Sequence, residues 1–212
     1  MTLANKLTIG RIMIIPFFIL FMFIGSIYTR VTALLIFTLA ALTDLYDGII
    51  ARHREEVTNF GKFIDPLADK LIVSAALISF VQLRELSIPA WMVIVVISRE
   101  FIITGLRSVA ASRGTIIPAS VAGKFKTTSQ MVVIITILII LIVNALLKNY
   151  LHTTPLELQT LLSWERMLGY ILSRAPYWLM LMVTILTVIS GFNYILRNKR
   201  ILFEEISSKT TN

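Results

Sequence analysis

The sequence predicts an all-α polytopic membrane protein with six transmembrane helices and both termini in the cytoplasm. Hydrophobic residues make up 57% of the 212 residues, and the mean hydropathy is +0.83, whereas soluble domains contain about 45–50% apolar residues. Six long apolar runs follow one another, and basic residues gather at alternate ends of them. These runs and their connections use up the chain, so we expect one membrane domain over residues 1–212.

Each apolar run is long enough to cross a bilayer as a helix, which takes about 20 residues. The expected spans lie near residues 7–27, 32–50, 67–84, 88–106, 128–147 and 177–196. The first run differs from a secretory signal peptide because it is too long, carries Arg11 near its start and lacks a small-x-small cleavage site. We therefore expect it to be retained as a helix.

The basic residues predict the orientation of the chain. With a cytoplasmic amino terminus and alternating helices, 15 Lys and Arg residues face the cytoplasm and 5 face outwards, which is the usual bias of membrane proteins. Arg30, one of the five, is interpreted as an orientation marker. The net charge of +8 does not indicate nucleic-acid binding, because the basic residues lie at helix ends. The absence of cysteine excludes disulfides and thiolate metal sites.

The longest connection, residues 148–176, lies on the expected outer side between the last two helices. Apolar residues at three- and four-residue spacing predict a short amphipathic helix there, lying in the membrane interface. They are Leu158, Leu161, Leu162, Leu168, Ile171 and Leu172. The aromatic residues Trp164, Tyr170, Tyr177 and Trp178 fit an interfacial belt.

Four aspartates stand at the facing ends of the second and third expected helices. Asp44 and Asp47 are three residues apart, and Asp65 and Asp69 are four apart, so each pair lies on one helical face. A connection of modest length could bring all four together on the cytoplasmic side. A charged aspartate at mid-membrane costs about 2.5–3.5 kcal/mol on insertion scales, so four of them need a compensating charge.

Divalent cations would supply that charge. Carboxylates without His or Cys suit a hard ion such as Mg²⁺, with Mn²⁺ or Ca²⁺ as alternatives. Four carboxylates can hold two such ions, an arrangement that stabilises the attacking and leaving oxygens in phosphoryl transfer. Gly48 and Gly61 leave space beside the carboxylates, and Arg52 lies one turn beyond Gly48, where its guanidinium could grip a diphosphate.

Structural roles could explain single residues of this group. Asp65 precedes Pro66, a pattern typical of a helix N-cap, and Arg52 could simply mark topology. Asp69 with Lys70 could form an interfacial charge cluster. Such explanations would all have to hold at once for six residues at regular spacing, so we favour a functional site.

These residues resemble the signature of the CDP-alcohol phosphotransferase family. The pattern Asp-x2-Asp-Gly-x2-Ala-Arg-x8-Gly-x3-Asp-x3-Asp occurs without departure. It consists of Asp44, Asp47, Gly48, Ala51, Arg52, Gly61, Asp65 and Asp69. The resemblance implies a six-helix membrane enzyme, usually a homodimer, with its active site open to the cytoplasm.

The resemblance also implies roles for individual residues. Asp44, Asp47 and Asp65 would be metal ligands for two Mg²⁺ ions, and Asp69 would be both a ligand and the general base. The donor CDP-diacylglycerol would be bound by Gly48, Arg52, Thr58, Gly61, Asn5 and Thr8.

Further stretches resemble the bacterial phosphatidylglycerophosphate synthases within this family. They are "NKLTIGR", "GKFIDPLADK", "SREFIITGLRSVAASRG" and "GKFKTTSQM", and the likeness runs from the amino terminus to about Met131. It implies transfer of the phosphatidyl group from CDP-diacylglycerol to the primary hydroxyl of glycerol 3-phosphate, with release of CMP. Residues 148–176 are longer than the resemblance leads us to expect, which leaves the outer face and dimer contacts open.

A second basic group supports a phosphate-bearing acceptor. Arg99 and Glu100 lie within an apolar run, where charges need a partner or a wet cavity, and Arg107 lies two turns along nearly the same face. Lys124 and Lys126 precede the fifth expected helix on the same side of the membrane. Such a group could bind the phosphate of glycerol 3-phosphate beside the metals. The alternative is that Arg99 and Glu100 neutralise neighbours while the lysines mark topology.

Other functions remain open at this point. The same chemistry could use inositol phosphate, serine or phosphatidylglycerol as acceptor. A divalent-cation transporter would also place carboxylates in the membrane, but near its middle and on several helices. A purely structural membrane protein would leave the aspartates without a partner. Because no transit-like extension is present, we expect a bacterial plasma membrane.

Overall fold

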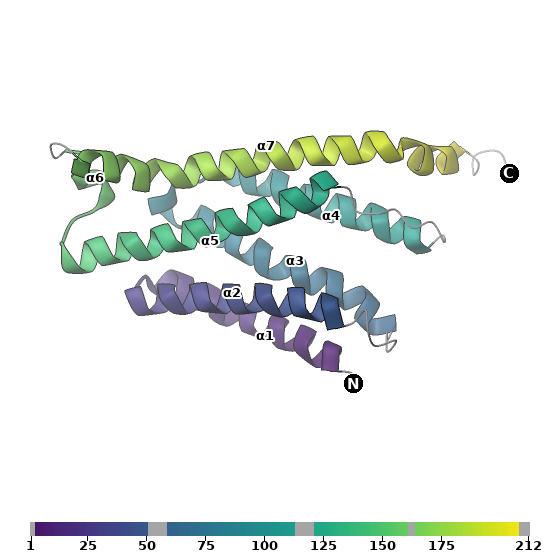
Figure 1. Cartoon of the computed structure of the whole chain (residues 1–212), viewed down its shortest axis with the longest axis horizontal. Coiled ribbons are helices and arrows are strands. Elements are labelled where there is room, and N and C mark those ends of the chain that lie inside the picture. Colours follow the sequence, from purple (N-terminus) through teal and green to yellow (C-terminus); the bar gives the residue numbers. More distant parts are fainter. Residues whose placement is uncertain (1–2, 51–58, 113–120, 161–163, 208–212) are drawn as a thin grey trace.

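The computed structural model describes residues 3–50, 59–112, 121–160 and 164–207, all of them in helices or short connections. Six long helices dominate this part of the chain and run back and forth along one axis (Figure 1). Their bounds are α1 Leu3–Ile24, α2 Ile27–Ile50, α3 Asn59–Gln82, α4 Ala90–Ser112, α5 Val121–Tyr150 and α7 Trp164–Ser207. Both termini lie at the same end of the bundle. The predicted all-α class is therefore confirmed.

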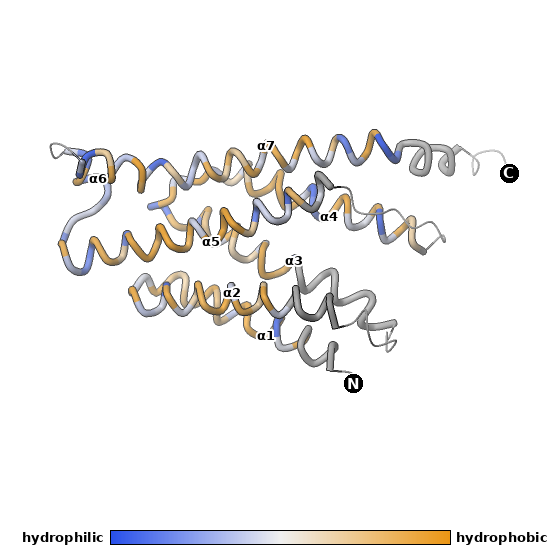
Figure 2. Tube along the Cα trace, viewed as in Figure 1, coloured by the Kyte–Doolittle hydropathy of each residue, from blue (hydrophilic) through white to orange (hydrophobic). Residues whose placement is uncertain are grey.

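The long helices coincide with the apolar runs of the sequence. Within the described residues, α5 from Phe125 to Tyr150 and α7 from Trp164 to Asn198 are long and apolar enough to cross a membrane. Shorter apolar stretches lie at 9–24, 27–43 and 70–82. Figure 2 shows apolar colouring along much of α1, α2 and α5, with polar segments near the bundle ends. The expectation of six spans stays a prediction.

Two groups of helices share one apolar core. α1 packs against α2 and α3, α7 packs against α4 and α5, and α5 closes the bundle against α2. The centre is filled by fully buried side chains, which include Phe18, Phe37, Leu77, Phe80, Ile134, Ile137 and Met180. Many large apolar side chains, such as Phe17, Leu39 and Ile94, are instead exposed on the outside of the bundle. So much exposed apolar surface suits lipid contact rather than water.

The connection between α5 and α7 is built from two pieces. The four-residue helix α6, Pro155–Leu158, begins with Thr154 as N-cap, and Thr154 and Glu157 form a reciprocal capping box. The first turns of α7 follow, where Leu168 and Leu172 pack with Leu158 against α5. The apolar side chains of this connection therefore pack against α5. They belong to α6 and to the start of α7, and not to the one separate amphipathic helix that the sequence predicted. Its place in a membrane interface stays a prediction, and Leu161 and Leu162 lie outside the described residues.

Arg30 does more than mark orientation. Its side chain is buried near the start of α2 and forms an ion pair with Glu85 of the short 3-10 helix η1, Arg84–Leu86. The same guanidinium donates to the backbone carbonyl of Leu141 in α5. A buried charge with these partners ties α2, α5 and η1 together, and removing Glu85 would leave the Arg30 guanidinium without a counter-charge.

Gly169 allows α6 to lie directly against α7. A methyl group at this position would sit 2.5 Å from the Pro155 carbonyl oxygen and 2.7 Å from the Leu158 Cβ. We expect Gly169→Ala to push α6 away and lower the apparent unfolding temperature in detergent, because overpacking costs about 1–3 kcal/mol.

Gly105→Ala in α4 is the matched control, since its methyl group would meet no atom within 4 Å. Alanine is preferred to glycine inside a helix by about 1 kcal/mol, so the unfolding temperature should stay unchanged or rise. An equal loss in both variants would show that close α6–α7 packing is not the cause.

Candidate active site

The aspartate motif lies where α2 ends and α3 begins. Asp44 and Asp47 belong to the last turns of α2, and Asp65 and Asp69 belong to the first turns of α3. These two helix ends lie at the same end of the bundle as the termini (Figure 1). For the four aspartates, and for Gly48 and Gly61, the structure describes the helical backbone and not the side chains. Arg52 and Thr58 lie outside the described residues.

A metal site formed by this motif is compatible with the helices that carry it. Among the side chains that the structure describes, no group of three His, Cys, Asp or Glu could hold a metal ion, and the four aspartates are not among them. By their spacing in the sequence, the aspartates form one pair near each of these two helix ends, and each pair falls on one helical face. Carboxylates alone, with no imidazole or thiolate in the motif, form a donor set that suits hard divalent ions.

Glu100 of α4 is the centre of a charge cluster beside the motif. Its carboxylate accepts from Lys70 Nζ at 2.8 Å and from the Arg99 guanidinium at 2.9 Å. Lys126 of α5 also pairs with it. Because Lys70 directly follows Asp69 in α3, the cluster begins one residue from the last aspartate of the motif. We call Lys70, Arg99, Glu100 and Lys126 the Glu100 cluster.

Lys126 is the most deeply buried cation of this cluster. Its side chain is 2% exposed, and its ammonium group donates to Glu100 and to the side-chain oxygen of Gln130 one turn along α5. An ammonium group in this position needs several partners, because taking it out of water costs several kcal/mol in practice. Glu100 and Gln130 supply two of them.

Arg99 links the cluster to α7. Its guanidinium donates to the Ser190 hydroxyl at 2.9 Å, and its aliphatic part lies against Gly191. A methyl group on Gly191 would lie 3.0 Å from Arg99 Cγ and 3.3 Å from its Nε. The glycine therefore leaves the room that the arginine side chain occupies, and Ser190 fixes its direction.

The charges of the cluster do not cancel. Three cations share one carboxylate, which leaves a net charge of +2 in a largely buried place. Such a surplus attracts anions, and its effect is stronger there than in water because the surroundings screen it less.

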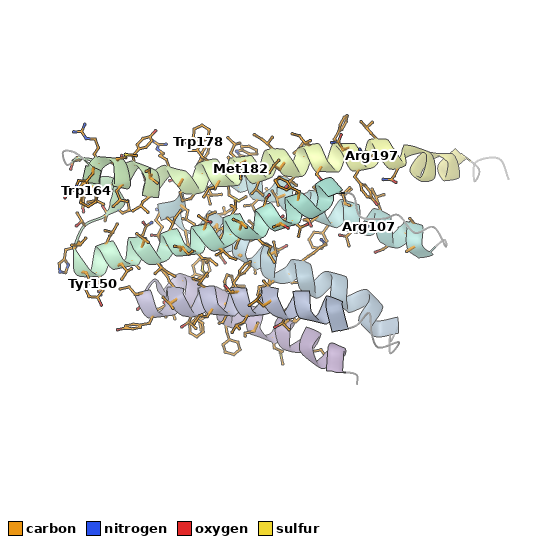
Figure 3. The ribbon with its side chains drawn as sticks, in the orientation of Figure 1. Arg107, Tyr150, Trp164, Trp178, Met182 and Arg197 are labelled. Atoms are coloured by element: carbon orange, nitrogen blue, oxygen red, sulfur yellow. The ribbon has the colours of Figure 1, made fainter. Side chains whose placement is uncertain are left out.

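The structure brings together only part of the predicted acceptor group. Arg99 and Lys126 meet at Glu100, whereas Arg107 is exposed on α4, at the end of the bundle that also carries Arg197 (Figure 3). Lys124 lies in the first turn of α5, and Asn5 and Thr8 lie in α1, each with only its backbone described. The ion pair between Arg99 and Glu100 also fits the alternative interpretation, in which Arg99 only neutralises a neighbouring charge.

The sequence analysis did not identify Lys70, Gln130 and Ser190 as members of this site. From the sequence, Lys70 is treated as part of an interfacial charge cluster with Asp69, and Glu100 as a charge within an apolar run. Because an isolated charge in such a run is costly, these two residues of opposite charge could have been paired. Gln130 and Ser190 carry no comparable signal, since neutral polar residues are frequent in membrane helices.

Comparison with known proteins identifies close relatives. The chain is 40% identical over 208 residues to the CDP-diacylglycerol–glycerol-3-phosphate 3-phosphatidyltransferase of Bacillus subtilis, covering 92% of this chain and 94% of that protein. It is 42% identical over 135 residues to a probable phosphatidylglycerophosphate synthase of Mycobacterium tuberculosis, covering 62% of this chain and 63% of that protein. A Rickettsia typhi enzyme with the Bacillus enzyme's name is 40% identical over 129 residues, covering 61% and 71%.

The family profile extends over most of the chain. The profile described as CDP-alcohol phosphatidyltransferase matches residues 1–189, which include the aspartate motif and every member of the Glu100 cluster. With a full match to the motif and a relative aligned over nearly its whole length, this chain belongs to the CDP-alcohol phosphatidyltransferase family.

Proposed function

We propose that this membrane-bound enzyme transfers the phosphatidyl group of CDP-diacylglycerol to the primary hydroxyl of glycerol 3-phosphate. The products are phosphatidylglycerol phosphate and CMP. One structural observation carries the proposal: Lys70, which follows Asp69 of the motif, is joined through Glu100 to Arg99 and Lys126. A carboxylate motif for the donor diphosphate thus adjoins a cationic cluster for the acceptor phosphate. The relatives' names give the same acceptor.

The donor lipid binds at the aspartate-bearing end of the bundle. Its acyl chains stay in the bilayer while its diphosphate lies at the motif. Gly48 and Gly61 have no side chain, so the diphosphate can approach the protein backbone closely at these positions. The Arg52 guanidinium binds a diphosphate oxygen. Thr58, Asn5 and Thr8 complete the donor site in this proposal. Bound there, two Mg²⁺ ions on Asp44, Asp47, Asp65 and Asp69 would neutralise phosphate charge and fix its position.

Asp69 acts as the general base. Its carboxylate accepts the proton of the acceptor's primary hydroxyl as that oxygen forms a bond to the β-phosphorus of the donor. The bond between the β-phosphorus and the bridging oxygen breaks, and CMP leaves with the electron pair. Positioning and electrostatic stabilisation carry most of the rate acceleration in such transfers.

The Glu100 cluster orients the acceptor. Its net charge of +2 matches the phosphate dianion of glycerol 3-phosphate. Arg99 and Lys126 are the primary contacts in this proposal, and Arg107 and Lys124 extend the basic surface. Glu100 acts through its neighbours: it holds the Lys126 ammonium in place instead of contacting the acceptor.

The membrane arrangement follows from the same proposal. All six long helices span the bilayer, the termini and the aspartates face the cytoplasm, and the enzyme resides in a bacterial plasma membrane as a homodimer. Both termini, the end of α2 and the start of α3 lie at the same end of the bundle, which supports placing them on one side of the membrane (Figure 1). Apolar side chains on the outside of the bundle support the lipid contact.

Release of CMP tests the reaction and its acceptor. With purified protein, CDP-diacylglycerol and Mg²⁺, we expect CMP to form with glycerol 3-phosphate and not with inositol phosphate, serine or phosphatidylglycerol. Asp69→Asn should reduce the rate at least 100-fold, because a general base contributes about 10²–10⁴-fold. CMP formation with another acceptor would keep the chemistry and overturn the specificity. Mg²⁺ transport without CMP release would favour a cation transporter.

Metal dependence tests the assignment of the aspartates. A divalent metal is the cofactor of this family, and we expect EDTA to abolish CMP release and added Mg²⁺ to restore it. Asp44→Asn and Asp47→Asn should each raise the Mg²⁺ concentration needed for half-maximal rate, since a ligand charge is lost. Glu165→Gln, at a partly exposed carboxylate in the first turn of α7, is the control. An unchanged Mg²⁺ requirement in both aspartate variants would contradict their role as ligands.

Substitution of Lys126 tests the acceptor site. Lys126→Gln should raise KM for glycerol 3-phosphate about 10- to 100-fold, the range expected for one lost hydrogen bond to a charged group. KM for CDP-diacylglycerol should change little.

Arg174→Gln removes an exposed cation at the other end of the bundle and serves as the charge-matched control. If Lys126→Gln lowers kcat equally with every substrate and leaves both KM values unchanged, Lys126 stabilises the fold and does not bind the acceptor.

A further inference from the structure

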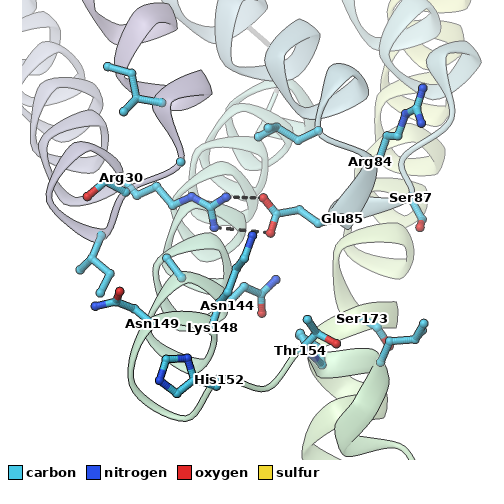
Figure 4. Close-up of a pocket in the computed structure, with 18 of the residues that line it drawn as sticks. Arg30, Arg84, Glu85, Ser87, Asn144, Lys148, Asn149, His152, Thr154 and Ser173 are labelled. Carbon is cyan, nitrogen blue, oxygen red and sulfur yellow. Dashed lines mark hydrogen bonds and ion pairs between the residues drawn. The ribbon is translucent and has the colours of Figure 1, made fainter.

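A second polar site lies at the opposite end of the bundle from the aspartates. A cavity of about 1060 Å³ opens between the α1–α2 turn, η1, the end of α5 and the start of α6. We call it the Arg30 pocket; its lining includes Arg30, Glu85, Asn144, Lys148, His152 and Ser173 (Figure 4). Its volume slightly exceeds the range typical of small-molecule sites, about 300–1,000 Å³.

The charges of this pocket favour an anion. Arg30, Arg84 and Lys148 outnumber Glu85, so the lining carries a net charge of +2 with His152 neutral. Arg30 engages the Glu85 carboxylate, while Lys148 forms no ion pair within the described residues. The Lys148 side chain extends into the pocket towards the Arg30–Glu85 pair (Figure 4). A ligand with an ammonium group would find no free carboxylate here, but a phosphate would meet an available cation.

The pocket also has unused hydrogen-bonding capacity. Asn144 is 5% exposed, and its buried side-chain oxygen has no donor in the described part of the protein. Buried polar atoms are normally satisfied, so an orphan oxygen in the wall of a cavity indicates a missing partner. The described residues with positive φ, Gly25, Ser87 and His152, all line this cavity. Non-glycine residues in that conformation are uncommon and cluster at functional positions.

The rim indicates that the ligand is a lipid. Ile24, Tyr28 and Leu156 line the same pocket and are 55%, 80% and 71% exposed. A water-soluble phosphate would gain nothing from these side chains, whereas a phospholipid could lay its acyl chains against them. We propose that the Arg30 pocket binds the headgroup of an anionic phospholipid, with its phosphate at Lys148 and its hydroxyls near Asn144. With the aspartates on the cytoplasmic side, this lipid belongs to the outer leaflet.

Lipid titration of the delipidated full-length protein, followed by native mass spectrometry, tests this site. Phosphatidylglycerol should bind at least fivefold tighter than phosphatidylcholine with the same acyl chains. Lys148→Gln should weaken phosphatidylglycerol binding about fivefold, the effect of one cation near anionic lipid. Lys148→Arg should preserve it. Arg174→Gln is the control, because this exposed cation at the same end does not line the pocket.

Three results would overturn the proposal. They are equal affinity for both lipids, equal weakening by Lys148→Gln and Arg174→Gln, and displacement of phosphatidylglycerol by millimolar inorganic phosphate. The last result would identify a site for free phosphate. Asp69→Asn should retain the bound phosphatidylglycerol, which separates this site from the proposed active site even if the proposed reaction proves wrong.

Discussion

A single, largely buried carboxylate holds several helices of this bundle together. Glu100 receives cations from α3, from its own helix α4 and from α5, and Arg99 extends the contact to α7 through Ser190. Four helices thus meet at one acidic side chain in an otherwise apolar environment. In lipid, apolar packing alone provides little preference between alternative helix rotations, so polar contacts of this kind determine which faces meet.

The same interaction joins the two halves of the fold. α1, α2 and α3 form one layer of contacts, while α4, α5 and α7 form another. Lys70 of the first layer forms an ion pair with Glu100, which belongs to the second layer. Lys126 and Arg99 of the second layer pair with the same carboxylate. At the other end, Arg30 on α2 reaches Glu85 and the α5 carbonyl of Leu141. Two ionic contacts, one centred on Glu100 and one on Arg30, thus link the helices in addition to their apolar packing.

The sequence predicted the elements of this structure better than their mutual rotation. Apolar length alone identifies the long helices, and the spacing of Asp44, Asp47, Asp65 and Asp69 identifies the candidate site. Opposite charges favour a pairing of Lys70 with Glu100, but the sequence could not predict the helix rotations that bring the two side chains together. Helices that are apolar on nearly every face carry no periodic signal of which side meets a neighbour. Arg30 shows the same limit: charge counting places it on one side of the membrane, but only the fold reveals its burial beside Glu85.

The length of α7 has a consequence for the shape of the protein at the membrane. Its 44 residues extend for about 66 Å at 1.5 Å per residue, whereas a bilayer is about 40–45 Å thick including its headgroups. In the proposed membrane arrangement, an untilted α7 would therefore extend about 20 Å beyond the headgroups. In that proposed arrangement, the C-terminal turns that extend past the membrane surface flank the aspartate-bearing end of the bundle. Water-soluble substrates would then reach the proposed site alongside α7, while lipids would enter from the bilayer.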